Sequence, residues 1–81
     1  MYVYILYSEI SSRYYTGQTA DIDKRLVLHN QGNVVSTKNG IPWKLVLQIL
    51  VASRTEAMIL EKKIKKRGAR RFIEDNTPGL T

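Results

Sequence analysis

Two short segments rich in aromatic and β-branched residues lie close together at the start of the chain. Residues 2–7 read Tyr-Val-Tyr-Ile-Leu-Tyr and residues 14–18 read Tyr-Tyr-Thr-Gly-Gln, with the mostly polar residues 8–13 between them. Such composition is typical of strands, and so short a connection suits antiparallel neighbours. The sequence therefore predicts a β-hairpin. Tyr4 and Tyr15 would lie close together in it if both face the same side, which depends on a register that the sequence leaves open.

A third strand and a helix are predicted further along the chain. In residues 43–52, every second position from 45 to 51 is leucine, isoleucine or valine, which indicates a mostly buried strand. Before it, Asp21 is suited to cap a helix that runs to about residue 31. Arg25 and His29 are four positions apart in that helix, so they would point from one face toward the hairpin.

The rest of the chain divides into a loop and two more helices. Residues 32–42 contain asparagine, serine, threonine and two glycines, which predicts a loop. Residues 53–56, Ser-Arg-Thr-Glu, form a capping box that begins a helix, and Gly68 is suited to end it. Residues 69–75 are expected to form a short helix. The predicted order is ββα-β-αα, an α+β fold with a small three-stranded β-sheet and flanking helices.

Length and composition further limit the kinds of protein that this chain can be. Eighty-one residues suit one small domain over 1–81, with a core of about residues 2–75 and a tail, 76–81, that we expect to fray. The chain has no cysteine and one histidine, which excludes a disulfide framework, a thiolate zinc site and a histidine-rich metal cluster. The apolar start lacks a basic signal-peptide region, and no stretch approaches the roughly 20 apolar residues of a membrane span. We therefore expect a cytoplasmic protein with no membrane partner.

Positive charge is concentrated in the second half of the chain. Residues 1–40 hold four basic and three acidic side chains, a net charge of +1, whereas residues 41–81 hold nine basic and four acidic ones, a net charge of +5. A cluster of this kind indicates a phosphate-backbone partner, although a solvated helix face is the plainer alternative. Lys38 could also contact a phosphate or be simply solvated. Seven of the cations form the cluster: Lys62, Lys63, Lys65, Lys66, Arg67, Arg70 and Arg71.

Five residues, in order, resemble the motifs of the GIY-YIG nucleases: Tyr4, Tyr15, Arg25, His29 and Glu61. The likeness runs from residue 2 to about 73 and is greatest to short, stand-alone bacterial members, which share phrases seen here at 36–46 and 61–66. This chain has Tyr2 and Thr16 where the family name has Gly and Ile. The resemblance implies the α+β fold predicted above and hydrolysis of phosphodiester bonds.

Each motif residue has a chemistry that suits this reaction. Glu61 is a single carboxylate for one Mg²⁺ or Mn²⁺ ion, which would also contact substrate phosphate. The resemblance makes Tyr4 or Tyr15 a base or a nucleophile. Arg25 could clamp a phosphate oxygen, His29 could move a proton near neutral pH, and a glycine lets the backbone approach a phosphate. That glycine is Gly17.

Plainer structural roles stay open for the same residues. Tyrosines in strands usually serve packing, and Glu61 could form an ion pair with Arg25 or Lys44. The family also places a supporting Asn near the end of the domain, often before Pro. Here either Asn76 or Thr77 takes that position, and we favour Thr77, which offers a hydroxyl but no amide.

The leading hypothesis is a metal-dependent DNA endonuclease, structure-selective or weakly specific, that acts in repair or recombination. A catalytically weak or inactive nucleic-acid-binding module is the alternative, favoured by the small size and the changed Asn position. A scaffold for an acidic protein surface would use the same charge but would leave the motif residues unexplained. RNA as substrate and a protein partner for targeting both stay open.

Overall fold

The computed structural model describes residues 1–76 and contains the predicted order of strands and helices. The sequence-based ββα-β-αα order and the three-stranded α+β fold are confirmed. One short 3-10 helix, η1, is added within residues 32–42, which the sequence predicted to be a plain loop. The elements are β1 (Tyr2–Ser8), β2 (Arg13–Thr19), α1 (Ile22–Asn30), η1 (Val35–Gly40), β3 (Trp43–Leu50), α2 (Arg54–Arg67) and α3 (Ala69–Asp75).

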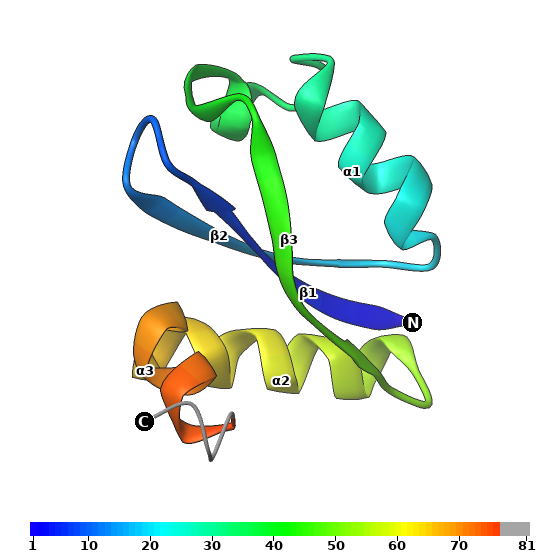
Figure 1. Ribbon diagram of the computed structural model, residues 1–81. Helices are drawn as coiled ribbons and strands as arrows, with labels where there is room; N and C mark the ends of the chain where they lie inside the picture. The colour runs from blue at the N-terminus through cyan, green and yellow to red at the C-terminus, as the bar shows by residue number, and fades with distance from the viewer. Residues whose placement is uncertain (77–81) are drawn as a thin grey trace.

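The sheet is antiparallel in the order β2-β1-β3, with β1 at its centre. Helix α1 covers one face of the sheet, and α2 with α3 covers the other (Figure 1). Because successive side chains of a strand point to opposite faces, β1 contributes to both sides. Its residues 3–6 are all at most 2 % exposed. The central strand is therefore buried on both faces.

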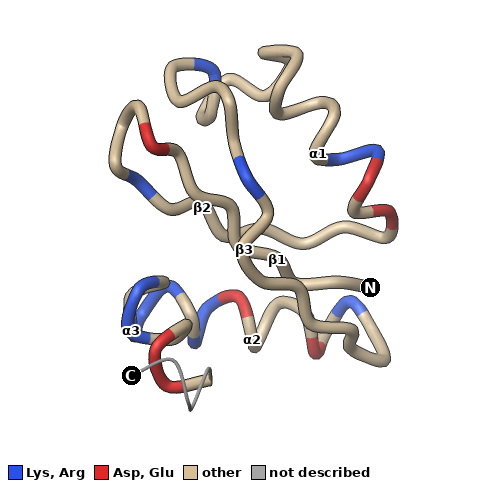
Figure 2. The backbone as a smooth tube through the Cα atoms, in the orientation of Figure 1, with Lys and Arg blue, Asp and Glu red and all other residues tan. Residues whose placement is uncertain are grey.

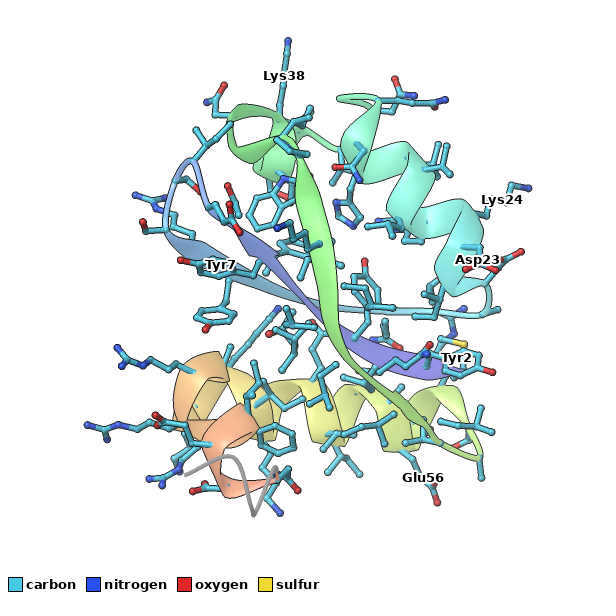
Figure 3. The ribbon with its side chains drawn as sticks, viewed as in Figure 1. Tyr2, Tyr7, Asp23, Lys24, Lys38 and Glu56 are labelled. Carbon is cyan, nitrogen blue, oxygen red and sulfur yellow. The ribbon has the colours of Figure 1, made fainter. Side chains whose placement is uncertain are left out.

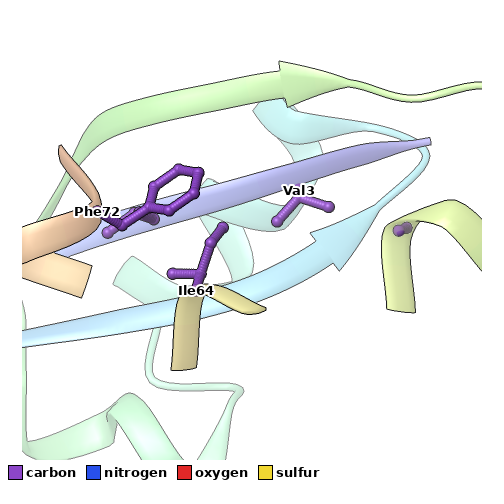
Figure 4. Close-up of a cluster of buried hydrophobic side chains, with 5 residues drawn as sticks. Val3, Ile64 and Phe72 are labelled. Carbon is purple, nitrogen blue, oxygen red and sulfur yellow. The ribbon is translucent and has the colours of Figure 1, made fainter. Parts of the chain in front are cut away.

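Two apolar clusters form, one on each face of the sheet. Val3 and Ile5 pack with residues of α2 and α3, among them Ile64 and Phe72 (Figure 4). Tyr4 belongs to the other cluster, on the α1 side, together with other buried residues of β1, α1 and β3. This second cluster contains the motif tyrosines, so the face covered by α1 is the one that builds the candidate site.

Strand β3 differs from its simple alternating pattern. The pairing with β1 shifts between Ile5 and Leu6, which leaves Val46 as an extra residue in β3. Such a bulge reverses the side-chain alternation on either side of it. Leu45 therefore packs in the α1-side cluster, whereas Leu47 packs in the α2-side cluster. The prediction that the strand is mostly buried was wrong: it lies at the sheet edge, and alternate residues are exposed.

The predicted helix caps are present. Asp21 Oδ1 accepts a hydrogen bond from Lys24 N, and Ser53 Oγ accepts one from Glu56 N. Glu56 Oε2 also accepts a hydrogen bond from Ala52 N, one residue before the N-cap Ser53. No helix within residues 1–76 has the length and apolar content needed to cross a membrane. Of the tail that was predicted to fray, residues 76–81, only Asn76 is described, and it is hydrogen-bonded to the end of α3. Residues 77–81 lie outside the described part of the chain.

Candidate active site

The Tyr4 hydroxyl and the His29 imidazole form the centre of the candidate site. Tyr4 Oη and His29 Nε2 are 2.9 Å apart, and both side chains are buried, at 2 % and 0 % exposure. Tyr4 comes from the central strand β1, and His29 comes from the last turn of α1. The helix thus places its only histidine over the strand, as the spacing of Arg25 and His29 predicted.

A threonine that the sequence did not single out contacts the second nitrogen of His29 and supports one assignment of the two nitrogens. Thr37 Oγ1 lies 2.8 Å from His29 Nδ1, and the Thr37 hydroxyl donates to Val34 O at 3.3 Å. We assign the hydroxyl proton to that bond, and on this assignment the Thr37 oxygen accepts from an Nδ1–H group. His29 Nε2 is then unprotonated, and Tyr4 donates to it. The site therefore holds a phenol that can pass its proton directly to an imidazole.

Tyr15 lies beside this pair. In the hairpin Tyr4 pairs with Gly17 and Leu6 pairs with Tyr15, so Tyr4 and Tyr15 face the same side. The Tyr15 ring centroid is 6.3 Å from that of Tyr4 and 4.9 Å from that of His29. The register, which the sequence could not fix, thus brings both motif tyrosines to one site.

Gly17 makes room for the Tyr4 hydroxyl. A Cβ atom at Gly17 would lie 2.6 Å from Tyr4 Oη and 2.8 Å from Tyr4 Cζ, closer than real Cβ contacts. The Tyr4 ring must therefore cross the strand at a position without a side chain. The sequence suggested that Gly17 lets the backbone approach a phosphate; the structure adds this second reason for a glycine.

Gly17→Ala is expected to destabilise the fold by about 1–3 kcal/mol, because the added methyl group must push the Tyr4 ring aside. Urea unfolding of both proteins measures this cost. The matched comparison is Gly17→Ala in a Tyr4→Leu background, where no hydroxyl or Cζ occupies the space and the cost should largely disappear. An equal loss in both backgrounds would contradict this explanation.

Arg25 reaches the two phenols from α1. Burial raises the pKa of Tyr4, and the hydrogen bond and charge of Arg25 act against this by favouring the phenolate. Arg25 also has a buried Nε that makes no hydrogen bond within residues 1–76. A buried donor without a partner is costly, and a phosphate oxygen could satisfy it only if the side chain moved to expose the Nε atom. The structure thus places the positive charge of Arg25 next to Tyr4.

The pKa of His29 is lowered, first by burial and then by the positive charge of Arg25. The unfolded chain consequently takes up a proton on this side chain at a higher pH than the folded protein does. Folding stability is then complete above the ordinary pKa of 6.5 and is lost as the pH falls below that value toward the folded pKa.

We therefore expect the free energy of unfolding to decrease as the pH is lowered from about 7 to 5, a window near the histidine pKa and above those of most carboxylates. Because His29 is the only histidine, urea unfolding at each pH can be assigned by comparison with His29→Gln. That variant should lose most of the slope in this window. An unchanged slope would show that His29 does not titrate as its burial requires.

Glu61 lies on α2 and is half-buried, with 19 % of its side chain exposed. Its Oε2 pairs with Lys65 Nζ at 2.7 Å, whereas Lys44 pairs with Glu9 at 2.8 Å. The suggested Glu61 ion pair with Lys44 is thus wrong, and no ion pair with Arg25 occurs among residues 1–76. The negative charge of Glu61 contributes to raising the pKa of Tyr4, although burial is the main cause. The negative charge of Glu61 is therefore close enough to act on Tyr4.

A metal ion would have Glu61 as its protein ligand in this arrangement. No group of three or more histidine and acidic side chains gathers within residues 1–76. The described residues therefore offer no closed, all-protein metal site. Mg²⁺ and Mn²⁺ do not require one, because such ions keep several water molecules and take substrate phosphate oxygens.

The basic residues gather where α2 ends and α3 begins (Figure 2). Three of the seven pair with acidic residues of α2 or α3: Lys65 with Glu61, Arg67 with Asp75 and Arg70 with Glu74. Lys38 lies on η1, at the far end of the molecule from this cluster, and points outward (Figure 3). The structure thus gathers the seven predicted cations but not Lys38.

Asn76 has a local structural role. Its Nδ2 donates to Phe72 O at 2.8 Å, at the C-terminal end of α3. It lines a hollow with Ile49 and Leu60, on the β3 side of the sheet. Asn76 is therefore not brought to the tyrosine pair, and the favoured candidate, Thr77, lies outside the described residues.

The order and geometry of these residues can be compared with known proteins. The model of the GIY-YIG catalytic domain matches residues 1–73. The chain belongs to the GIY-YIG family. This domain is a nuclease-type catalytic domain, and divalent metal ions are general in its nucleases. No solved structure is significantly similar to the chain.

Several bacterial proteins of the GIY-YIG family are similar to this chain. The UPF0213 protein spr1390 of Streptococcus pneumoniae is 35 % identical over 79 residues, covering 93 % of this chain and 79 % of its own length. UPF0213 protein SH2523 of Staphylococcus haemolyticus is 40 % identical over 65 residues, or 79 % and 78 % of the two chains. UPF0213 protein BH0048 of Halalkalibacterium halodurans is 38 % identical over 65 residues, or 79 % and 68 %.

Two polar residues that the sequence analysis missed hold the candidate site in place. Thr37 is 1 % exposed and is held from both sides, since Trp43 Nε1 donates to its carbonyl oxygen at 2.7 Å. The Asn30 side chain forms two hydrogen bonds with the Trp43 backbone: Oδ1 accepts from Trp43 N at 2.6 Å, and Nδ2 donates to Trp43 O at 3.1 Å. A lone Thr or Asn in a polar stretch carries no periodic signal, so only the fold identifies these contacts.

Proposed function

We propose that this protein is a metal-dependent DNA endonuclease, structure-selective or weakly specific, that acts in DNA repair or recombination. The observation that carries the proposal is the buried hydrogen bond from Tyr4 to His29 Nε2, with Arg25 beside it. A phenol in this setting can accept a proton from an attacking water while it passes its own to the imidazole. The family's nuclease-type domain supports this use.

The remaining groups suit the other requirements of phosphodiester hydrolysis. Arg25, whose Nε has no hydrogen-bond partner within residues 1–76, would bind a phosphate oxygen. The bond from phosphorus to the leaving oxygen breaks as the water oxygen bonds to phosphorus. Glu61 would hold Mg²⁺ or Mn²⁺, which supplies positive charge for the phosphoryl group. The exposed cations of α2 and α3 would bind the backbone of the nucleic acid without reading its sequence.

The test is cleavage of labelled DNA single strands, duplexes, flaps, splayed arms and four-way junctions with Mg²⁺, Mn²⁺ or EDTA. The proposal would be supported by cleavage activity that requires the metal and that elutes together with the protein in gel filtration. Binding that weakens steeply with salt, without cuts in any metal, would instead identify an inactive binding module. The engagement of Asn76 in capping α3 is the observation that favours this second function.

A further inference from the structure

A hollow of about 570 Å³ lies between the edge strand β2 and the junction of α2 with α3. Its volume falls within the range of small-molecule binding sites, about 300–1,000 Å³. Three consecutive residues of β2 line one side, and four cations from the two helices line the other. The charged and aromatic members are Tyr14, Tyr15, Lys65, Arg67, Arg70 and Arg71.

The Tyr14 ring is placed to stack on a base. Tyr14 pairs with Tyr7 across the hairpin, and their ring centroids are 4.8 Å apart, so the Tyr14 ring is supported from behind. Its side chain remains accessible, at 38 % exposure. An exposed, supported aromatic ring beside cations is the combination that holds single-stranded nucleic acids, by stacking on the base and charge on the backbone.

The cations of this hollow can exchange their partners for phosphate. The Arg67–Asp75 and Arg70–Glu74 pairs are exposed on both sides, and exposed pairs of this kind are weak because water screens them. Arg71 makes none of the ion pairs found among residues 1–76, although its charge helps to lower the pKa of Asp75. A phosphate group would thus meet available guanidinium groups.

The hollow adjoins the candidate site through Tyr15. This residue lines the hollow and also lies 4.9 Å from His29, ring centroid to ring centroid. A second hollow, lined by Ser11, Arg13 and Asn39 among others, shares both Tyr14 and Tyr15. A strand that crosses the β2 edge would therefore place one nucleotide in the cationic hollow and the next phosphate near Tyr15.

We propose that the cationic hollow binds one unpaired nucleotide of the DNA, next to the bond that is cut. This inference rests on the proposed nuclease function and names its substrate class: DNA with a single-stranded nucleotide at the cut, in preference to an uninterrupted duplex. In a duplex, each base is stacked and paired inside the helix, so it cannot stack on Tyr14 without being unpaired at a cost.

The experiment measures binding in EDTA, by anisotropy of dye-labelled DNA, for a blunt duplex and for the same duplex with a short central gap. Wild type should bind the gapped DNA at least tenfold more tightly. Tyr14→Leu should weaken gapped-DNA binding by about 5- to 100-fold, the usual loss for one stacked base. It should leave blunt-duplex binding within twofold, and Tyr14→Phe should keep the gap preference. Equal affinity of wild type for both forms would overturn the inference.

A second measurement uses only the wild-type protein, in case Tyr14→Leu does not fold. 5-Iodouracil at the unpaired position, activated by ultraviolet light, should cross-link to the peptide that contains Tyr14; a cross-link elsewhere would overturn the subsite. Because EDTA prevents metal-dependent cutting, the two proposals fail separately. Tighter binding of gapped DNA without any cleavage would contradict only the proposed nuclease function. Equal cleavage of gapped and blunt DNA would contradict only the proposed nucleotide subsite.

Discussion

Replacing Glu61 with glutamine is expected to lower metal-dependent DNA cleavage by about a thousandfold or more, because bound metal supplies several kcal/mol of transition-state stabilisation. Glutamine keeps the size of the side chain but removes the negative charge that binds the ion. The rate is measured on the best substrate of the panel at several Mg²⁺ and Mn²⁺ concentrations. If Glu61 binds the ion, high Mn²⁺ should restore part of the rate.

The matched control is Glu56→Gln, on the same helix. Glu56 accepts a hydrogen bond from Ala52 N, which a glutamine oxygen can still accept, so cleavage should change less than twofold. The Glu61–Lys65 pair is partly solvated, so the melting temperature of Glu61→Gln should stay close to that of wild type. A loss of cleavage that no metal concentration affects, with lowered stability, would assign Glu61 to the ion pair instead.

The second large effect is expected for Tyr4→Phe, which removes the hydroxyl that donates to His29 Nε2. Loss of a general acid–base group usually slows a reaction by about 10²–10⁴-fold. Single-turnover cleavage measures the chemical step directly. Tyr2→Phe, on the same strand but outside the tyrosine–histidine pair, should cleave at the wild-type rate.

The pH dependence separates a chemical role of Tyr4 from a structural one. In wild type, cleavage should fall below the pKa of His29 as the imidazole becomes protonated and can no longer accept the Tyr4 proton. The pKa of His29 is lowered by its burial, so this fall should lie on the acid side of an ordinary histidine. Tyr4→Phe should flatten this limb in its residual rate. Unchanged cleavage in Tyr4→Phe would leave Tyr15 as the catalytic phenol.

Much of this fold is readable from the sequence, because local signals agree with the tertiary structure. The caps at Asp21 and Ser53 mark where two helices begin, and Gly68, with φ of 94°, separates α2 from α3. The spacing of Arg25 and His29 predicted one helical face, and the structure places both near Tyr4.

What the sequence could not supply depends on contacts between distant segments. Alternation in residues 45–51 cannot reveal the bulge at Val46, because the shift is set by pairing with β1. The joint position of Tyr4 and Tyr15 depends on hairpin register, and a turn without a glycine signal does not determine it. Thr37 is eight residues from His29, and only the η1 turn brings them within 2.8 Å.

The Trp43–Thr37 contact gives the protein a built-in optical reporter. Trp43 is the only tryptophan, it is 6 % exposed, and its Nε1 donates to the residue that orients His29. Its ring also lies 6.4 Å from that of Tyr15. Any event that loosens η1 admits water to the indole, which shifts its emission to longer wavelength. The placement of His29 by η1 can thus be followed in unlabelled protein through the fluorescence of Trp43.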